Sequence, residues 1–431
     1  MVRTKTMIVL GLLLFLISTS ALADQPTADK PEDWEKRLEM LRSVPYLALS
    51  EAEVDESDTG VVFYNPELAH QGYNFYGTRT SGEAFVIDME GRVVHRWSYT
   101  PKRGAGSDHA HMLENGDLII IKKFEELLRI NWDSDVIWRR SLPPHHDVAQ
   151  GPDGSLYVII REVRPHRGLN VRFAAMVRLT EDGDLIEKWS TYTHLAEIKN
   201  VLDTRSFMDA VLDSALAGRS QEEKETIQAK IEITRDLCNF DYFHLNSVNF
   251  LPATISGQKD ARFREGNLLV CFRNVNQIAV LEQDTYRVLW GWGEGELQWP
   301  HHPTMLDNGH ILIFDNGIKR DYSRVVEMDP LTGTIVWEYV ADPPEEFFSY
   351  ARGSAQRLPN GNTLICESDK GRAFEITHDG EVVWVWLNPA TEQGHRVTVY
   401  RMIRMPTDQV EALLNRRWWW SRLVSKLKRL W

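Results

Sequence analysis

The chain has 431 residues, of which 43% are hydrophobic and 10% aromatic, so it can bury a large core. It carries 62 Asp and Glu against 49 Lys and Arg, a formal net charge of -13. This acidic balance argues against a general nucleic-acid-binding protein, which needs a basic surface to hold phosphates.

The N-terminus has the composition of an export signal. A basic start precedes an apolar run over residues 7–17, and Ala-Leu-Ala at 21–23 suits cleavage after that triplet. The run is short for a membrane span, although an uncleaved anchor stays open as an alternative. We expect a signal at 1–23, then an N-terminal segment at 24–59 with a short helix over 31–43. The protein is then exported, to the periplasm or cell envelope.

One phrase recurs along the chain with a histidine at its head. In the clearest copy, His302 is followed by Leu306, by Asn308-Gly309 and by an apolar run over 311–314. A turn between apolar runs indicates a β-hairpin. The same frame, with looser spacing in some copies, follows four further heads: His109, His146, His244 and Ser354.

A second phrase, a turn followed by aliphatic residues and then tryptophan, occurs six times at a spacing of about 40–50 residues. This is the period of four-stranded propeller blades. The sequence therefore predicts an all-β fold, a six-bladed β-propeller over 60–406, in which each headed run is an inner strand and each tryptophan hairpin an outer pair. The tryptophans are Trp97, Trp138, Trp189, Trp290, Trp337 and Trp386.

Three segments complete the predicted organisation. The hairpin at 84–97 has no inner strand of its own, and the run 397–406 can supply it, so that strands from both chain ends close the ring and hide its edges. Residues 193–236 have a helical pattern and interrupt the ring. Residues 407–431 predict a C-terminal amphipathic helix, strongly basic over 416–431, which suits contact with an anionic membrane surface. Docking on the propeller itself is the alternative.

Five segments of the chain carry more specific sequence. They are DYFHLNSV (241–248), HHPTML (301–306), IFDNG (313–317), YSRVVEMD (322–329) and VWEY (336–339). Together they resemble the arylsulfate sulfotransferases, exported bacterial six-bladed propellers that move a sulfuryl group between phenols without a nucleotide donor. The resemblance extends as a pattern over 60–406 and is sharpest over 241–340.

The resemblance implies catalytic roles for four residues. His302 matches the histidine that becomes transiently sulfated, His244 matches a second active-site histidine, and His146 matches a third. Arg273 matches the arginine that holds the sulfate. The implied reaction is a ping-pong transfer through a sulfohistidine.

The resemblance also implies substrate contacts at Asn246 and at Ser354, the latter near a position where the family can carry threonine. The expected partners are a small phenolic sulfate and a phenol, with no metal and no cofactor. His109 heads the copy that fits the frame most tightly, yet it matches no catalytic position. We therefore expect it to have a structural or channel-lining role.

The residue types suit this chemistry. A neutral imidazole is a competent nucleophile near pH 7, because its reference pKa is about 6.5. Attack through His302 splits one transfer into two easier steps. Arg273 offers a planar cationic fork for an oxyanion. The side chains of His244 and His146 can donate to sulfuryl oxygens or pass a proton.

Other functions stay open at this point. The chain can instead be a non-enzymatic, envelope-associated propeller that binds or assembles partners, which the basic tail favours. Clustered histidines can also bind a metal, although an arginine in the matched site would repel a cation. The N-terminal β-domain through which the family dimerises is missing or shrunken here, so the oligomeric state is open.

Overall fold

Short strands joined by tight turns fill most of the described chain, as the alternating apolar runs predict. The structure is a computed structural model, and it describes residues 49–53, 59–79, 81–100, 108–166, 169–202 and 241–415. These residues all belong to one compact unit, Val44–Trp431. The expected signal, the helix over 31–43, residues 203–236 of the insertion and the basic segment 416–431 lie outside the described residues.

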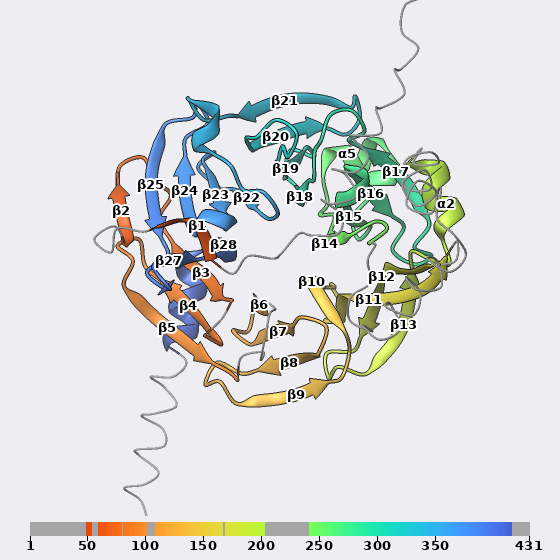
Figure 1. Cartoon of the computed structure of the whole chain (residues 1–431), viewed down its shortest axis with the longest axis horizontal. Coiled ribbons are helices and arrows are strands. Elements are labelled where there is room, and N and C mark those ends of the chain that lie inside the picture. Colours follow the sequence, from red (N-terminus) through yellow and green to blue (C-terminus); the bar gives the residue numbers. More distant parts are fainter. Residues whose placement is uncertain are drawn as a thin grey trace, which may run out of the picture. The chain divides into compact units, whose positions relative to one another are not determined.

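Six sheets of four or five strands are arranged in a ring, and one strand of each sheet lies nearest the centre (Figure 1). The predicted six-bladed β-propeller is therefore confirmed. From the inner strand outward, the first three blades contain β28 (Val399–Met405), β3 (Tyr73–Thr78), β4 (Glu83–Ile87) and β5 (Val93–Ser98); β6 (Asp108–Met112), β7 (Leu118–Lys122), β8 (Glu126–Ile130) and β9 (Val136–Arg140); β10 (Pro144–Gln150), β11 (Leu156–His166), β12 (Leu169–Leu179) and β13 (Leu185–Ser190).

The remaining blades follow in chain order. They contain β14 (Leu245–Phe250), β15 (Leu268–Phe272), β16 (Gln277–Leu281) and β17 (Val288–Trp292); β18 (His301–Met305), β19 (Ile311–Asp315), β20 (Arg324–Asp329) and β21 (Thr334–Tyr339); β22 (Ser354–Arg357), β23 (Thr363–Glu367), β24 (Arg372–Ile376), β25 (Val382–Leu387) and β2 (Gly60–Tyr64). A separate small sheet contains β1 (Leu49–Glu53), β27 (His395–Val397) and β26 (Thr391–Glu392).

Strands from both ends of the chain close the ring, as predicted. The C-terminal strand β28 pairs with β3 and is the inner strand of the first blade. The N-terminal strand β2 pairs with β25 on the outer edge of the sixth blade. A buried ion pair, with 2.9 Å between Arg404 Nη1 on β28 and Glu375 Oε2 on β24, links the first blade to the sixth.

The hydrophobic core lies between neighbouring blades. Successive side chains of a strand point to opposite faces of its sheet, so each strand serves two interfaces. On β19, Ile311 and Ile313 pack against the fourth blade, while Leu312 and Phe314 pack against the sixth. The ring is thus held together by a series of apolar clusters between its blades.

Helices are few in the described chain. Within the predicted insertion, α2 (Leu195–Val201) is helical, and residues 407–415 form the start of the predicted C-terminal helix. The short elements α5 (Ile255–Lys259), η1 (Ala261–Phe263), η2 (Arg273–Val275), η3 (Pro344–Glu346) and η4 (Ser368–Lys370) were not predicted. Among the described residues, no helix is long and apolar enough to cross a bilayer.

The hairpin topology gathers the head residues at one mouth of the central channel. Antiparallel pairing places the start of each inner strand beside the end of the second strand. His301 lies opposite Phe314 in the fifth blade, and Leu245 lies opposite Phe272 in the fourth. The same arrangement in every blade brings residues that are distant in sequence to this mouth.

Candidate active site

Three heads of the repeated phrase share an unusual backbone conformation. His146, His244 and His302 have positive φ angles of 65°, 53° and 47°, a region that few residues other than glycine adopt. The ladder between the first two strands shifts register at or beside each of them. Bulges of this kind redirect side chains and are frequent beside active sites.

The other two heads have ordinary strand geometry. His109 and Ser354 lie in regularly paired strands, β6 and β22. The backbone conformation thus separates His146, His244 and His302, which were expected to be catalytic, from His109, which was expected to be structural or channel-lining. The His109 ring is buried and lies 4.2 Å, centroid to centroid, from the ring of Tyr400 on β28.

Histidines of the third and fourth blades form a buried cluster. The rings of His146 and His244 are 4.5 Å apart between centroids, and those of His145 and His146 are 4.8 Å apart. Burial is the largest cause that lowers the pKa of each of these histidines. The cluster is therefore neutral at pH 7.

A carboxylate fixes the tautomer of His244. Its Nδ1 lies 2.5 Å from Asp241 Oδ2, and Arg172 Nη2 lies 3.1 Å from the same oxygen. An ionised carboxylate only accepts hydrogen bonds, so Nδ1 carries the proton and Nε2 carries the lone pair. Burial, followed by the guanidinium groups of Arg273 and Arg172, holds the pKa of His244 well below its usual range. Neutral His244 is thus suited to accept a proton rather than to donate one.

Arg273 directly follows β15 and is buried beside this cluster. Its guanidinium carbon lies 4.3 Å from the centroid of the Trp299 ring. Its Nε and Nη2 both donate to Asn274 Oδ1, at 3.1 and 3.0 Å. These contacts hold the guanidinium in one orientation among the histidines, which suits an anion-binding group.

His302 lies with a different arginine. Burial first, and then the guanidinium of Arg401, lowers the pKa of His302 well below its usual range, so its ring is neutral at pH 7. Its Nδ1 has no hydrogen-bond partner among the described residues. Arg401 lies on β28 and donates to both carboxylate oxygens of Asp147, at 3.1 and 3.2 Å.

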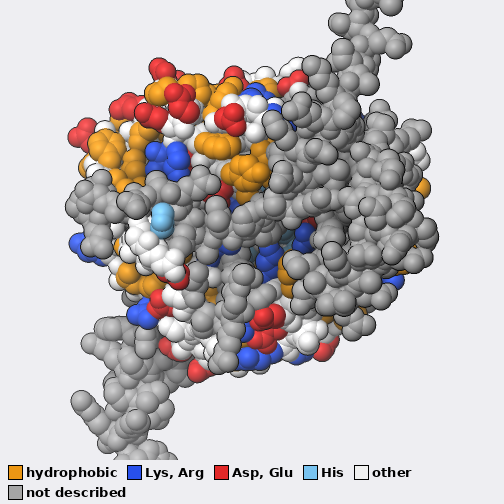
Figure 2. All heavy atoms as spheres, viewed as in Figure 1, with side chains coloured by type: hydrophobic (Ala, Val, Ile, Leu, Met, Phe, Trp, Pro, Cys, Tyr) orange, Lys and Arg blue, Asp and Glu red, His pale blue; other side chains and the backbone are white. Residues whose placement is uncertain are grey.

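A second repeated position adds positive charge to the mouth. In five blades, the residue that directly follows the second strand is buried and polar, and in three of these it is a cation. Figure 2 shows Lys and Arg side chains near the centre of the face in view. The five residues are Arg79, Lys123, Arg273, Asn316 and Ser368.

The structure brings His146, His244 and Arg273 together, and the charge of Arg401 acts on His302. Asn246 donates from Nδ2 to the Pro300 carbonyl at 3.0 Å, and its buried Oδ1 has no hydrogen-bond partner in the described chain. Ser354 is buried at the start of β22.

Three charged residues of the site were not predicted. Asp241 stands three residues before His244, so a carboxylate near a candidate histidine was a usable signal. Arg401 lies in the run that was predicted to close the ring. Lys123 occupies the same blade position as Arg273. This equivalence is found only when the ends of the second strands are aligned.

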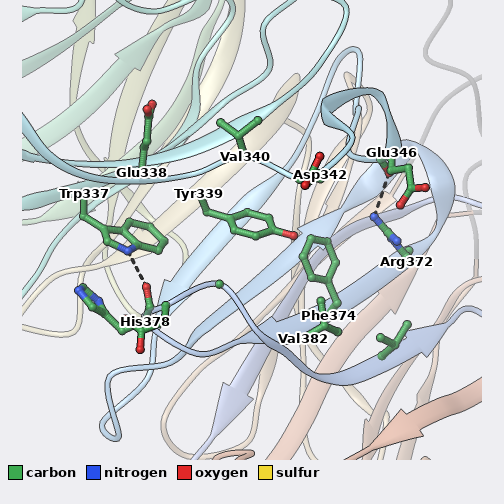
Figure 3. A pocket seen from close by; sticks show the side chains of 14 residues that line it. Trp337, Glu338, Tyr339, Val340, Asp342, Glu346, Arg372, Phe374, His378 and Val382 are labelled. Carbon is green, nitrogen blue, oxygen red and sulfur yellow. Dashed lines mark hydrogen bonds between the residues drawn. The ribbon is translucent and has the colours of Figure 1, made fainter.

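A separate cavity of about 430 Å³ lies on the outer strands of the fifth and sixth blades (Figure 3). Trp337 Nε1 donates to the His378 carbonyl at 2.9 Å, and Arg372 Nη2 donates to the Glu346 carbonyl at 3.2 Å. Tyr339 and Phe374 line the space between these two pairs. Because its walls come from outer strands, this cavity is distinct from the histidine cluster.

Within the described ranges, no three His, Cys, Asp or Glu side chains are arranged to hold a metal ion. A family model described as arylsulfotransferase (ASST) matches residues 109–389. The chain belongs to the arylsulfotransferase family. The matched range includes the four residues for which the resemblance implies catalytic roles: His146, His244, Arg273 and His302. Family membership indicates an arylsulfotransferase-like function.

No curated protein matches this member of the arylsulfotransferase family. Among solved structures, it is similar to a protein of unknown function from Bacteroides caccae, with a TM-score of 0.48 and 14% identity over 77% of this chain and 98% of that one. It is also similar to a streptogramin B lyase, with a TM-score of 0.44 and 10% identity over 83% and 96% of the two chains. A catalytically inactive virginiamycin B lyase from Staphylococcus aureus has a TM-score of 0.42 and 11% identity over 78% and 87%.

Proposed function

We propose that the protein moves a sulfuryl group from a phenolic sulfate ester to a phenolic acceptor, with a sulfohistidine at His302 between the two half-reactions. The observation that carries the proposal is the set of buried, neutral histidines held among arginines at the starts of the inner strands. In a member of the arylsulfotransferase family, such a set supplies both a nucleophile and sites for the sulfuryl charge.

The hydrogen bonds of the neighbouring histidines favour His302 as the nucleophile. His301 Nδ1 lies 2.7 Å from Asn316 Oδ1 and 3.0 Å from the Trp299 carbonyl, so this nitrogen donates. The Nδ1 of His302, in contrast, has no partner in the described chain. A buried neutral imidazole with an available lone pair is a competent nucleophile.

Two arginines can take the charge on the sulfuryl oxygens. Arg273 is oriented by Asn274 and Trp299, and Arg401 is oriented by Asp147. Donors that are already oriented in a buried site stabilise developing charge without reorganisation, and losing one such donor typically costs about 10²–10³-fold in rate.

In each half-reaction, one bond to sulfur forms as another breaks. In the first, the bond between sulfur and the donor phenol oxygen breaks while a bond from His302 nitrogen to sulfur forms. In the second, the acceptor phenol oxygen bonds to sulfur and the nitrogen–sulfur bond breaks, which restores His302. The lone pair on His244 Nε2 can accept a hydrogen bond from the acceptor phenol and orient it for attack.

A turnover assay tests this proposal. With p-nitrophenyl sulfate and a phenol acceptor, the protein should release nitrophenol and form the new sulfate ester. The change His302→Ala should lower the rate by about 10³-fold or more, as expected when a covalent nucleophile is removed. Equally low turnover by both proteins across many donors would instead favour a non-enzymatic, envelope-associated binding module.

We also propose that the protein is exported and contacts an anionic membrane surface through residues 416–431. The signal-like sequence at 1–23 and the basic amphipathic pattern of the tail support this proposal. Full-length protein should sediment with anionic vesicles, and a chain ending at residue 415 should not. Absence of vesicle binding by the full-length protein would contradict it.

A further inference from the structure

Each half-reaction moves a proton at a phenol oxygen, and the histidines of the mouth are poorly suited to supply it. Burial is the first cause that lowers the pKa of His146, His244 and His302. Their protonated forms are therefore scarce near pH 7. An efficient general acid needs a pKa near the working pH.

Lys123 lies beside the histidines of the third blade, His145 and His146. It directly follows β7, so it has the position in the second blade that Arg273 has in the fourth. Its side chain is buried, and its Nζ lies 5.1 Å from the centroid of the Phe124 ring. The same Phe124 ring lies 5.6 Å, centroid to centroid, from the ring of His145, which places Lys123 beside the cluster. Its charge also lowers the pKa of His145 and of His146.

Cations from other blades surround Lys123. Burial is the largest cause that lowers the pKa of its ammonium well below the usual range, and four guanidinium groups follow as causes. Two carboxylates of the mouth pair with two of these arginines: Asp241 with Arg172 at 3.1 Å, and Asp369 with Arg352 at 2.8 Å. The four arginines are Arg79, Arg172, Arg273 and Arg352.

The chemical type of this residue distinguishes it from its equivalents. Arginine stays protonated throughout the accessible pH range and cannot exchange a proton with a phenol. A lysine amine in a buried, cationic site can both lose and regain its proton near neutral pH. Among the five described residues at this repeated position, the others are arginine, asparagine or serine, and Lys123 is the one suited to proton transfer.

We propose that Lys123 is the general acid and base of the sulfuryl transfer, which rests on the proposed function. In the first half-reaction its ammonium gives a proton to the departing phenol oxygen as the oxygen–sulfur bond breaks. In the second, the resulting amine takes the proton from the acceptor phenol as its oxygen bonds to sulfur. The lysine and His302 both return to their starting states.

Leaving-group dependence tests the role. Phenyl sulfate has a poor leaving group that needs protonation, whereas p-nitrophenyl sulfate releases a stabilised phenolate. With Lys123→Met, kcat/KM should fall about 10²–10⁴-fold for phenyl sulfate, the usual contribution of general acid catalysis, and less than about tenfold for p-nitrophenyl sulfate. The variant Lys123→Arg keeps the charge but should show the same selective loss.

The neighbouring lysine offers a matched control. Lys122 is also buried, but its Nζ bonds to Glu126 Oε1 at 2.8 Å. Lys122→Met should show no preferential loss with phenyl sulfate. Equal losses on both donors in Lys123→Met, or a wild-type rate with phenyl sulfate in Lys123→Arg, would overturn the proposal. So would a selective loss in His244→Gln that Lys123→Met lacks.

A second readout needs no turnover. Acetylation of the wild type by acetic anhydride, mapped by peptide mass, should modify Lys123 at a lower pH than exposed lysines such as Lys259. If the protein turns over aryl sulfates but Lys123 is acetylated only at the pH at which exposed lysines react, the role of Lys123 is contradicted and the proposed function is not. A wild type that forms no sulfohistidine with any donor would defeat the proposed function, and the inference with it.

Discussion

At the residue scale, the amino-acid type at the head of each repeat decides which chemistry is available there. The backbone conformation at that residue decides where its side chain points. The repeated histidines and Arg273 were visible in the sequence, because the frame repeats and the neighbouring segments resemble one family. The left-handed conformation of His146, His244 and His302 was not predictable, because only a few per cent of residues other than glycine adopt it. Tertiary pairing imposes it, through the bulges beside each head.

The tautomer of His244 leads to a prediction at this scale. In Asp241→Asn, the amide can turn its NH₂ toward Nδ1, which moves the ring proton to Nε2 and removes the acceptor from the phenol site. We expect kcat/KM for aryl sulfate turnover to fall by about 10²-fold. Asp153→Asn, in an exposed turn of the third blade, is the control and should keep its activity. An unchanged kcat/KM in Asp241→Asn would show that the carboxylate has no such role.

At the scale of elements, the blade pattern could be read from periodic turns and apolar runs, including the inner strand that β28 supplies. The charged positions at the ends of the second strands could not, because they become equivalent only when the strands are aligned in space. Lys123 and Arg79 were therefore not predicted as site residues, although Arg273 was. Arg401 was not predicted as a site residue either, because its strand was predicted only as the one that closes the ring.

Ring closure depends on a buried ion pair between elements that are distant in sequence. Arg404 and Glu375 have almost no exposed side-chain surface, and Arg404 Nε also donates to Asn74 Oδ1 at 2.7 Å. Arg404→Met leaves a buried carboxylate without its cation and should lower the free energy of unfolding by about 3–5 kcal/mol. Urea unfolding measures this loss. The double variant Arg404→Met with Glu375→Gln should recover part of it, and equal losses in both would contradict the explanation.

At the scale of the whole molecule, the propeller gathers neutral histidines and cations in one mouth, and this arrangement affects stability. Burial first lowers the pKa of His111 to about 4 and the pKa of His145 and of His301 to about 3. In the unfolded chain these histidines regain a pKa of about 6.5. The unfolded state thus binds more protons at acid pH, so stability is complete above about pH 6.5 and falls as the pH drops toward the folded pKa values.

This linkage predicts a protein that is labile in acid. Each such histidine removes about 1.4 kcal/mol of stability per pH unit below about pH 6. Urea midpoints should therefore fall steeply from pH 6.5 to pH 5 and stay nearly constant from pH 6.5 to pH 8. His145→Phe should make the acid decline shallower. Equal midpoints at pH 8 and pH 5 would contradict the buried neutral cluster.

Mass spectrometry after incubation with donor alone shows directly whether His302 carries the sulfuryl group. With p-nitrophenyl sulfate and no acceptor, the peptide that contains His302 should gain one sulfuryl group and lose it when phenol is added. His109→Gln changes the equivalent head of a regular strand and should leave the adduct on His302. An adduct on any other residue, or turnover without an adduct on His302, would contradict a sulfohistidine at His302.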